Sequence, residues 1–391
     1  MKKRILTISI LIIFSLSAVP VFSDELAAVW SRIYNTTPQL EAKISVMQNI
    51  IDLHDREMEP VITDALKDIV YSLDRSRSFN ERQQYDDLAR MMIRELGSLK
   101  AVDAAPEMYK VMQTTEDEFL RAVAIVGLGT AGARDYVDEI AEYLQYINSD
   151  IVKIENNEQR KSVIDACILA LERLKHPAGF EPVFFASIGR YARESVKKAE
   201  RALKNMVADP TDLVIDIIKA DNTFEIRLAA LGVEERSSAS PERQTEAASA
   251  AIEVSLIYNA VTPTDREYQT RTKVKSCELI RDLGVADESA VKWLGIMLNS
   301  STNVNELVIC LQALGTYSSD AAADVLAIYL AYHSDRRVSG MQYKDERAIR
   351  ECINALAASG NPRGKNALMM VEYSNWSSQT IRMAKNALKD L

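Results

Sequence analysis

Apolar and small residues recur along the chain in a helical pattern that itself repeats. A small-x-x-small-Leu signature returns nine times, with some decay, and its leucines are Leu96, Leu128, Leu171, Leu203, Leu231, Leu283, Leu314, Leu356 and Leu388. Six copies also carry a bulky apolar residue seven positions before the leucine. Offsets of 0, 4 and 7 form one stripe on a helix. A stripe that is small in the middle and bulky at its ends predicts a helix packed closely between neighbouring helices.

The spacing of the leucines predicts pairs of helices. Most spacings are near 32 residues, the shortest is 28 and the longest is 52. This length accommodates a signature helix, a turn, a second apolar helix and another turn. Second helices are expected over segments such as 135–147, 211–220, 289–298 and 321–333. Glycine and proline number 13 and 10, about half their usual share, and long helices follow from that scarcity.

Three runs carry a resemblance to the HEAT-repeat family: 121–129 (RAVAIVGLG), 226–232 (IRLAALG) and 310–315 (CLQALG). The resemblance implies an all-α fold, a right-handed α-solenoid of stacked HEAT-like helical hairpins. We predict about nine hairpins over residues 80–391. Residues 24–79 are expected to form an N-terminal helical cap, or a decayed tenth copy around Ile50. Glu95 and Asp282 replace the small residue before their leucines, and these two copies are expected to be the weak joints.

The N-terminus predicts export. Lys2, Lys3 and Arg4 precede an apolar stretch over residues 5–19, and Asp24 follows Ser23. This arrangement is typical of a secretory signal peptide, residues 1–23, cut after Ser23. The stretch is short for an anchor and no lipoprotein cysteine follows it, so no stable membrane insertion is expected after cleavage. The mature chain is expected to be periplasmic or secreted.

Charge disfavours nucleic acid as a partner. The chain has a net charge of −9, and loss of residues 1–23 would leave 44 basic against 56 acidic residues, a net charge of −12. No positive stripe able to neutralise several phosphates is visible in the sequence.

The four cysteines are expected to be free, buried thiols. Cys167, Cys310 and Cys352 occupy one repeat position where other copies have alanine, which predicts small core residues. Equivalent positions on adjacent helices lie about 9–10 Å apart, too far for a disulfide. Cys277 lies two residues off that register and is a separate case.

No combination of residues predicts catalysis, a metal site or a cofactor. The three histidines, His54, His176 and His333, lack metal-ligand spacing. Nucleophile turns, phosphate-binding glycine loops and paired cysteine motifs are absent from the sequence. We therefore expect no catalytic, cofactor-binding or metal-binding residues.

Aromatic and arginine side chains near the extended copies are the candidates for partner binding. The extra residues fall near 148–157 and near 334–343, the latter with an expected Arg336–Arg337 loop. Aromatic and arginine groups are typical interface anchors. The candidate set is Arg336, Arg337, Tyr332, Tyr343, Trp293 and Trp376, although Trp293 is also suited to packing between hairpins.

Together these patterns favour a non-enzymatic protein-interaction scaffold of the cell envelope, which binds a protein partner on a concave surface lined by second helices. The alternative is an exported enzyme of HEAT-like lyase or isomerase type, using acids or tyrosines on that face. A clustered pair of acids in a deep pocket would favour the enzyme. A shallow groove with aromatic and arginine residues would favour the scaffold.

Overall fold

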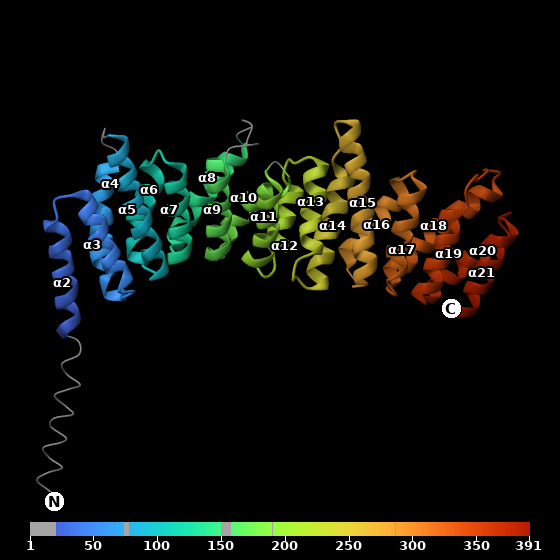
Figure 1. Cartoon of the computed structure of the whole chain (residues 1–391). Coiled ribbons are helices and arrows are strands. Elements are labelled where there is room, and N and C mark those ends of the chain that lie inside the picture. The colour runs from blue at the N-terminus through green and yellow to red at the C-terminus, as the bar shows by residue number, and fades with distance from the viewer. Residues whose placement is uncertain (1–20, 74–77, 150–157, 190, 286) are drawn as a thin grey trace, which may run out of the picture. The chain divides into compact units, whose positions relative to one another are not determined.

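The chain folds as an all-α solenoid of helical hairpins (Figure 1). The computed structural model describes residues 21–73, 78–149, 158–189, 191–285 and 287–391, and these ranges contain no strand. The helices group into two compact units, Met1–Val207 and Ala208–Leu391. The predicted all-α solenoid is thus confirmed.

Unit 1 begins with α2 (Val21–Thr36) and α3 (Leu40–Asp52). Its signature helices, which carry the repeat leucines, are α5 (Phe79–Ser98), α7 (Glu118–Ala131), α9 (Glu158–Leu174) and α11 (Arg193–Met206). Its second helices are α4 (Glu59–Leu73), α6 (Ala105–Thr114), α8 (Val137–Ser149) and α10 (Phe180–Ser187).

Unit 2 continues the alternation. Its signature helices are α13 (Phe224–Glu235), α15 (Pro263–Leu283), α17 (Val304–Gly315), α19 (Arg347–Ser359) and α21 (Ser378–Asp390). Its second helices are α12 (Thr211–Lys219), α14 (Pro241–Ile257), α16 (Glu288–Ser300), α18 (Asp320–Val338) and α20 (Lys365–Glu372).

Each unit has two layers of helices. In unit 1 the order α3, α5, α7, α9, α11 gives one layer in which each helix packs on the next, and α13, α15, α17, α19, α21 do the same in unit 2. Second helices pack on one another, as α12, α14, α16, α18 and α20 show, and also on the neighbouring signature helices. Since α3 packs on α5 with Ile50 buried, α3 occupies the place of a signature helix in unit 1.

The signature leucines form the core between the layers. Seven of the nine are at most 3 % exposed: Leu96, Leu128, Leu171, Leu203, Leu231, Leu314 and Leu356. Leu283 differs, because it is only half-buried while Ile280 and Cys277 are fully buried. The core register of α15 therefore lies closer to its N-terminus than the sequence pattern indicated, and Asp282 is exposed.

Glu95, the other departure from the pattern, lies in a different environment. Its side chain is almost wholly buried, and the His54 ring Nδ1 lies 3.5 Å from its Oε1. An acid thus replaces the small residue in α5 at a place where the turn after α3 supplies a polar neighbour.

Successive signature helices touch through small residues next to the leucines. A Cβ added to Gly129 in α7 would lie 2.5 Å from the Cα of Ala170 in α9. In unit 2, a Cβ added to Gly315 in α17 would lie 2.8 Å from the Cα of Ala355 in α19. The residue after one leucine thus packs on the residue before the next leucine, at backbone distance.

The turns after five of the signature helices share one conformation. A residue with positive φ follows the helix at Gly132, Gly284 and Gly360, and non-glycine residues take that place at Lys100 and Lys175. A short 3₁₀ turn then leads into the second helix in several hairpins, at η2 (Val102–Ala104), η3 (Arg134–Tyr136), η4 (Pro177–Gly179) and η5 (Pro362–Gly364). This geometry ends one helix and starts its antiparallel neighbour within a few residues.

Three further expectations from the sequence can be compared with the structure. The expected Arg336–Arg337 loop is wrong, because α18 continues as helix to Val338. Most of the extra segment near 148–157, and most of the expected signal peptide 1–23, lie outside the described residues, which start within α2. In the described ranges, no helix combines the length and apolar character that crossing a membrane requires.

The cysteine prediction is confirmed: all four are free and buried. The Cys310 Sγ donates to the backbone oxygen of Leu294, and the Cys352 Sγ donates to that of Leu326. Burial raises the pKa of the Cys167, Cys310 and Cys352 thiols, which favours the unreactive neutral form.

The close contact of α7 with α9 predicts a specific stability effect. Gly129→Ala should destabilise unit 1 by about 1–3 kcal/mol, because the new methyl group must push the two helices apart. Gly97→Ala is the matched control, since it holds the same repeat position in α5 but its Cβ would meet nothing closer than 3.4 Å. Thermal melting followed by circular dichroism distinguishes the two, and equal melting temperatures would refute the contact's importance.

Candidate binding surfaces

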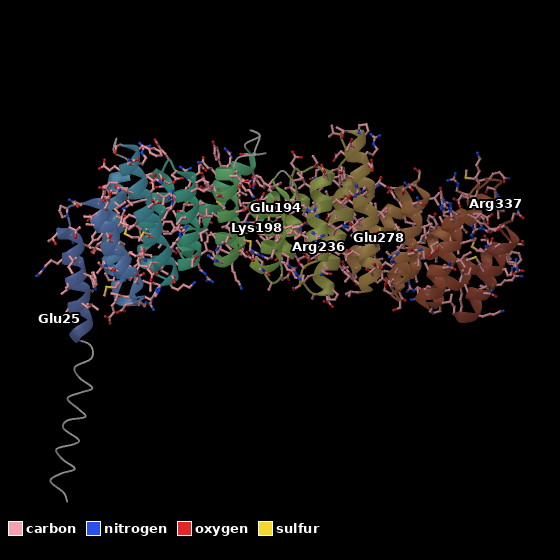
Figure 2. The ribbon with its side chains drawn as sticks, in the orientation of Figure 1. Glu25, Glu194, Lys198, Arg236, Glu278 and Arg337 are labelled. Carbon is pink, nitrogen blue, oxygen red and sulfur yellow. The ribbon has the colours of Figure 1, made fainter. Side chains whose placement is uncertain are left out.

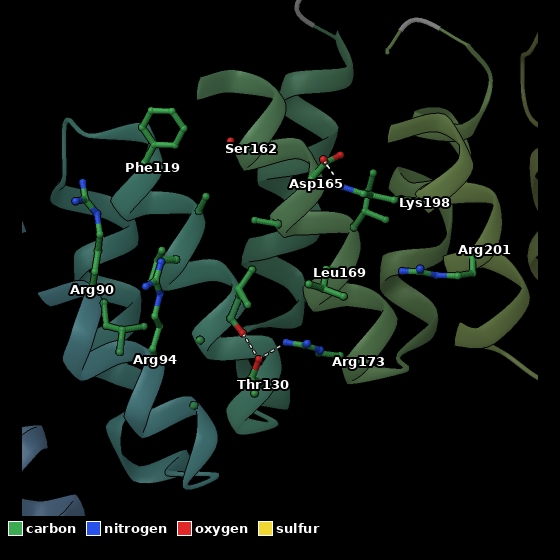
Figure 3. A pocket seen from close by; sticks show the side chains of 18 residues that line it. Arg90, Arg94, Phe119, Thr130, Ser162, Asp165, Leu169, Arg173, Lys198 and Arg201 are labelled. Atoms are coloured by element: carbon green, nitrogen blue, oxygen red, sulfur yellow. Dashed lines mark hydrogen bonds and ion pairs between the residues drawn. The ribbon is translucent and has the colours of Figure 1, made fainter. Parts of the chain in front are cut away.

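The signature helices of unit 1 form a groove of about 850 Å³. It is lined by side chains of α5, α7, α9 and α11 (Figure 3). The sequence predicted a binding surface lined by second helices. The groove is lined by signature helices instead. None of the residues that line it belongs to α4, α6, α8 or α10.

The floor of the groove is apolar. Helix α7 contributes Ala122, Val123, Val126 and Gly127, and α9 adds Ala166 and Leu169. Val123, Val126 and Leu169 are only half-buried, so part of their apolar surface remains in contact with water. Phe119, 44 % exposed, stands at one end of α7. Partly exposed apolar groups lining a concave surface are characteristic of binding sites.

The walls of the groove are basic. Five basic residues line it and only one acid: Arg90, Arg94, Arg173, Lys198 and Arg201 against Asp165. The groove thus has a local charge of opposite sign to the chain, whose net charge is −9. Such a local field attracts anionic groups despite the acidic surroundings.

The basic side chains differ in how far they are already neutralised. Lys198 Nζ lies 2.5 Å from Asp165 Oδ2, and Arg201 forms an ion pair with Glu172 at 3.0 Å. Arg90 pairs with Asp87 at 2.6 Å and also with Asp117. These three cations are therefore largely compensated by carboxylates of the same unit.

Arg94 and Arg173 remain available for a partner. Arg173 donates to the Thr130 hydroxyl, and Arg94 has no ion pair or hydrogen bond within the part of the chain that the structure describes. Figure 3 shows Arg94 on α5 and Arg173 on α9, on either side of the α7 segment that carries Thr130. Both side chains are exposed. Two uncompensated guanidinium groups thus flank an apolar floor.

Sequence reasoning missed this groove. Its residues come from four helices and about 110 positions of chain, and on each helix they resemble an ordinary solvated face. A usable signal was present in α7, because Val123 and Val126 are apolar although they lie outside the signature stripe, and the structure places both on the groove floor. Only the stacking of four hairpins brings these groups together.

Two other hollows lie in unit 2. One of about 490 Å³ lies over α15, α17, α19 and α21, and its charges balance: Arg347 and Arg350 against Glu278 and Glu351. Another of about 520 Å³ lies over the second helices α12 and α14 and is lined by six acids and Lys219. The two units therefore present surfaces of different charge.

Five of the six residues expected to bind a partner lie at one end of α18. The Tyr343 ring lies 5.5 Å from the His333 ring and 5.0 Å from the Trp376 ring. The Tyr343 hydroxyl lies 2.7 Å from His333 Nδ1, and burial lowers the pKa of His333. Arg336 donates to the Tyr332 hydroxyl at 2.7 Å. We call this set the α18 cluster: Tyr332, His333, Arg336, Arg337, Tyr343 and Trp376.

Much of the α18 cluster is engaged within unit 2. Trp376 is 4 % exposed and donates its ring N–H to Ser334. Arg337, labelled in Figure 2, donates to the backbone oxygen of Asn375. These contacts hold the end of α18 against the segment before α21, so Trp376 presents little surface to a partner. Tyr332, 53 % exposed, remains accessible. Trp293 lies apart on α16, with Lys292 over its ring at 4.5 Å.

The buried acids bear on the enzyme alternative. Glu306 is held by Lys273 at 3.1 Å and by the Ser301 hydroxyl at 2.7 Å, and the nearly buried Glu107 is held by Lys110. Asp86 lines a smaller hollow beside Arg90 and Asp117, and burial together with Asp117 raises its pKa. No group of three or more metal-ligating side chains occurs among the residues that the structure describes.

Among the described residues, Glu234 is the most deeply buried acid. It is fully buried, its Oε1 lies 2.8 Å from the Thr211 hydroxyl, and its Oε2 has no hydrogen-bond partner. Burial raises its pKa, so the neutral carboxyl is favoured. It lies outside the grooves described above.

Comparisons with known proteins give no family. No protein-family model matches the chain, and no curated protein sequence matches it. Among solved structures, an engineered protein is similar over 94 % of this chain and 98 % of its own, with 13 % identity and a TM-score of 0.33. A circular tandem repeat protein with a novel repeat topology is similar over 95 % and 94 %, with 10 % identity and a TM-score of 0.22. Similarities this low give no indication of function.

Glu234 predicts a pH-dependent stability. Because its folded pKa is raised, its contribution is fully present below the unfolded pKa of about 4.3 and is lost as pH rises through the folded pKa. The melting temperature of Glu234→Gln minus that of the wild type should therefore increase between about pH 4 and about pH 8.

Glu242→Gln is the control of opposite sign. A hydrogen bond from Ser240 lowers the pKa of Glu242, so its contribution is present at higher pH and is lost on acidification. The difference between this variant and the wild type should change in the other direction over the same range. A Glu234→Gln difference that is constant with pH would contradict the assignment.

Proposed function

We propose that the protein is an exported, non-enzymatic scaffold of HEAT-repeat type that binds a protein partner of the cell envelope. The observation that carries the proposal is the groove over α5, α7, α9 and α11, with its apolar floor and arginine walls. Apolar and arginine groups around a concave surface are the usual anchors of protein interfaces. HEAT-type membership rests on the repeated signature and on the alternation of signature and second helices.

Binding is favoured over catalysis by the state of the acids. The buried carboxylates Glu306 and Glu107 are held by lysines, and Glu234 lies away from the grooves. In the hollow beside Arg90, the lyase or isomerase alternative would use Asp86, whose neighbour Asp117 is the N-cap of α7 and pairs with Arg90. An acid occupied in this way is poorly suited to moving protons.

Photo-crosslinking in the native cell tests the binding face. A benzophenone amino acid at Phe119 or Leu169 should crosslink to a partner protein, because both side chains line the groove and are accessible. The control position is Tyr146, 65 % exposed on the second helix α8. Crosslinks that are equally strong from all three positions, or absent from the groove positions, would refute a partner on this face.

The mature N-terminus tests export separately. Val21 and Ser23 lie three and one positions before the expected cut, where a signal peptidase requires small or modest side chains. The protein isolated from the envelope fraction should begin at Asp24 by intact mass spectrometry. Recovery of the full chain, with residues 1–23, from the cytoplasmic fraction would contradict the assignment.

A further inference from the structure

We propose that the groove of unit 1 binds an acidic, amphipathic helical segment of the partner, with apolar side chains on the α7 floor and carboxylates on Arg94 and Arg173. The inference rests on the proposed function and specifies the chemistry of the partner. It follows from the floor, the uncompensated cations and the contrast with the groove of unit 2.

The floor requires apolar groups from the ligand. Val123, Val126 and Leu169 remain partly exposed in the groove, and Phe119 extends this apolar surface at the end of α7. Covering such surface contributes about 25 cal/mol per Å² of apolar area. An anion without apolar side chains would leave this apolar surface exposed to water. A helix with apolar residues at i, i+3, i+4 and i+7 would cover it.

The walls require carboxylates on the ligand. Arg94 and Arg173 stand on opposite sides of α7, and no carboxylate compensates either of them within the described residues. Arginine forks bind carboxylates through two parallel hydrogen bonds. A helix that places acids on both sides of its apolar stripe would meet one arginine with each edge.

The groove of unit 2 shows that the charge is particular to unit 1. It is lined by the same class of helix, yet Arg347 and Arg350 are matched there by Glu278 and Glu351. An acidic helix would gain no net attraction in that groove. The second groove therefore provides a control within the same molecule.

The experiment measures binding of synthetic peptides to the purified protein by fluorescence anisotropy. The probe is a labelled helical peptide of about 18 residues with leucines at i, i+3, i+4 and i+7 and flanking glutamates. Comparison peptides replace the glutamates with lysine, or the leucines with serine. The glutamate peptide should bind about tenfold or more tightly than either one, and more weakly as salt rises.

Charge reversal locates the site. Arg94→Glu combined with Arg173→Glu should weaken the glutamate peptide about tenfold or more. Arg347→Glu combined with Arg350→Glu makes the same charge change in unit 2 and should alter the affinity less than about twofold. Circular dichroism checks that both variants fold. If the double substitution destabilises unit 1, the single substitution Arg94→Glu replaces it in the binding measurement.

Three results would overturn the inference. The first is equal affinity for the glutamate and lysine peptides. The second is an Arg94→Glu/Arg173→Glu variant that binds the glutamate peptide as tightly as the wild type does. The third is an affinity for the serine peptide, or for a single-stranded oligonucleotide, equal to that for the glutamate peptide. The last result would assign the groove to polyanions in general. Crosslinking from Leu169 to a partner, without binding of the glutamate peptide, would refute this inference and leave the scaffold proposal standing.

Discussion

The close packing of successive signature helices through their smallest residues is the constraint on which the rest of the structure depends. Gly129 on Ala170 and Gly315 on Ala355 bring two backbones to a distance that any larger residue would prevent. Leucines beside these contacts can then fill the space between layers without voids. The scarcity of aromatic residues, 7 % of the chain, is consistent with signature helices that stand so close together within their layer.

The sequence predicted the fold well where the repeat is regular, and less well where a helix is longer than its neighbours. All nine signature leucines lie in signature helices, yet in α15 the core residue is Ile280 rather than Leu283. With 21 residues, α15 has several stripes that fit the pattern, and only packing against its neighbours selects one. Polar residues near Arg336 suggested a loop. They fit a helix equally well, because basic residues are favourable in the last turn of a helix such as α18.

The candidate sites were less predictable, because each depends on groups from several helices. Arginine and aromatic residues near position 336 do assemble, but Trp376 and Arg337 form contacts within unit 2. The sequence did not predict the groove of unit 1, because Arg94 and Arg173 lie 79 positions apart and each resembles an ordinary solvated charge. The net charge of the chain also gave no sign of the groove, because an acidic chain can contain a strongly basic hollow.

The backbone contacts of α7 have a consequence for recognition. On one side of α7 the Ile93 side chain of α5 fills the space beside Gly127, and on the other side Gly129 meets the backbone of Ala170, so the two glycines limit how far α5 and α9 stand from α7. These distances also determine how far apart Arg94 and Arg173 are held. The selectivity of the groove thus depends in part on Gly129 and Ala170, which do not line it, and a methyl group added at Gly129 would change the spacing of the two charges.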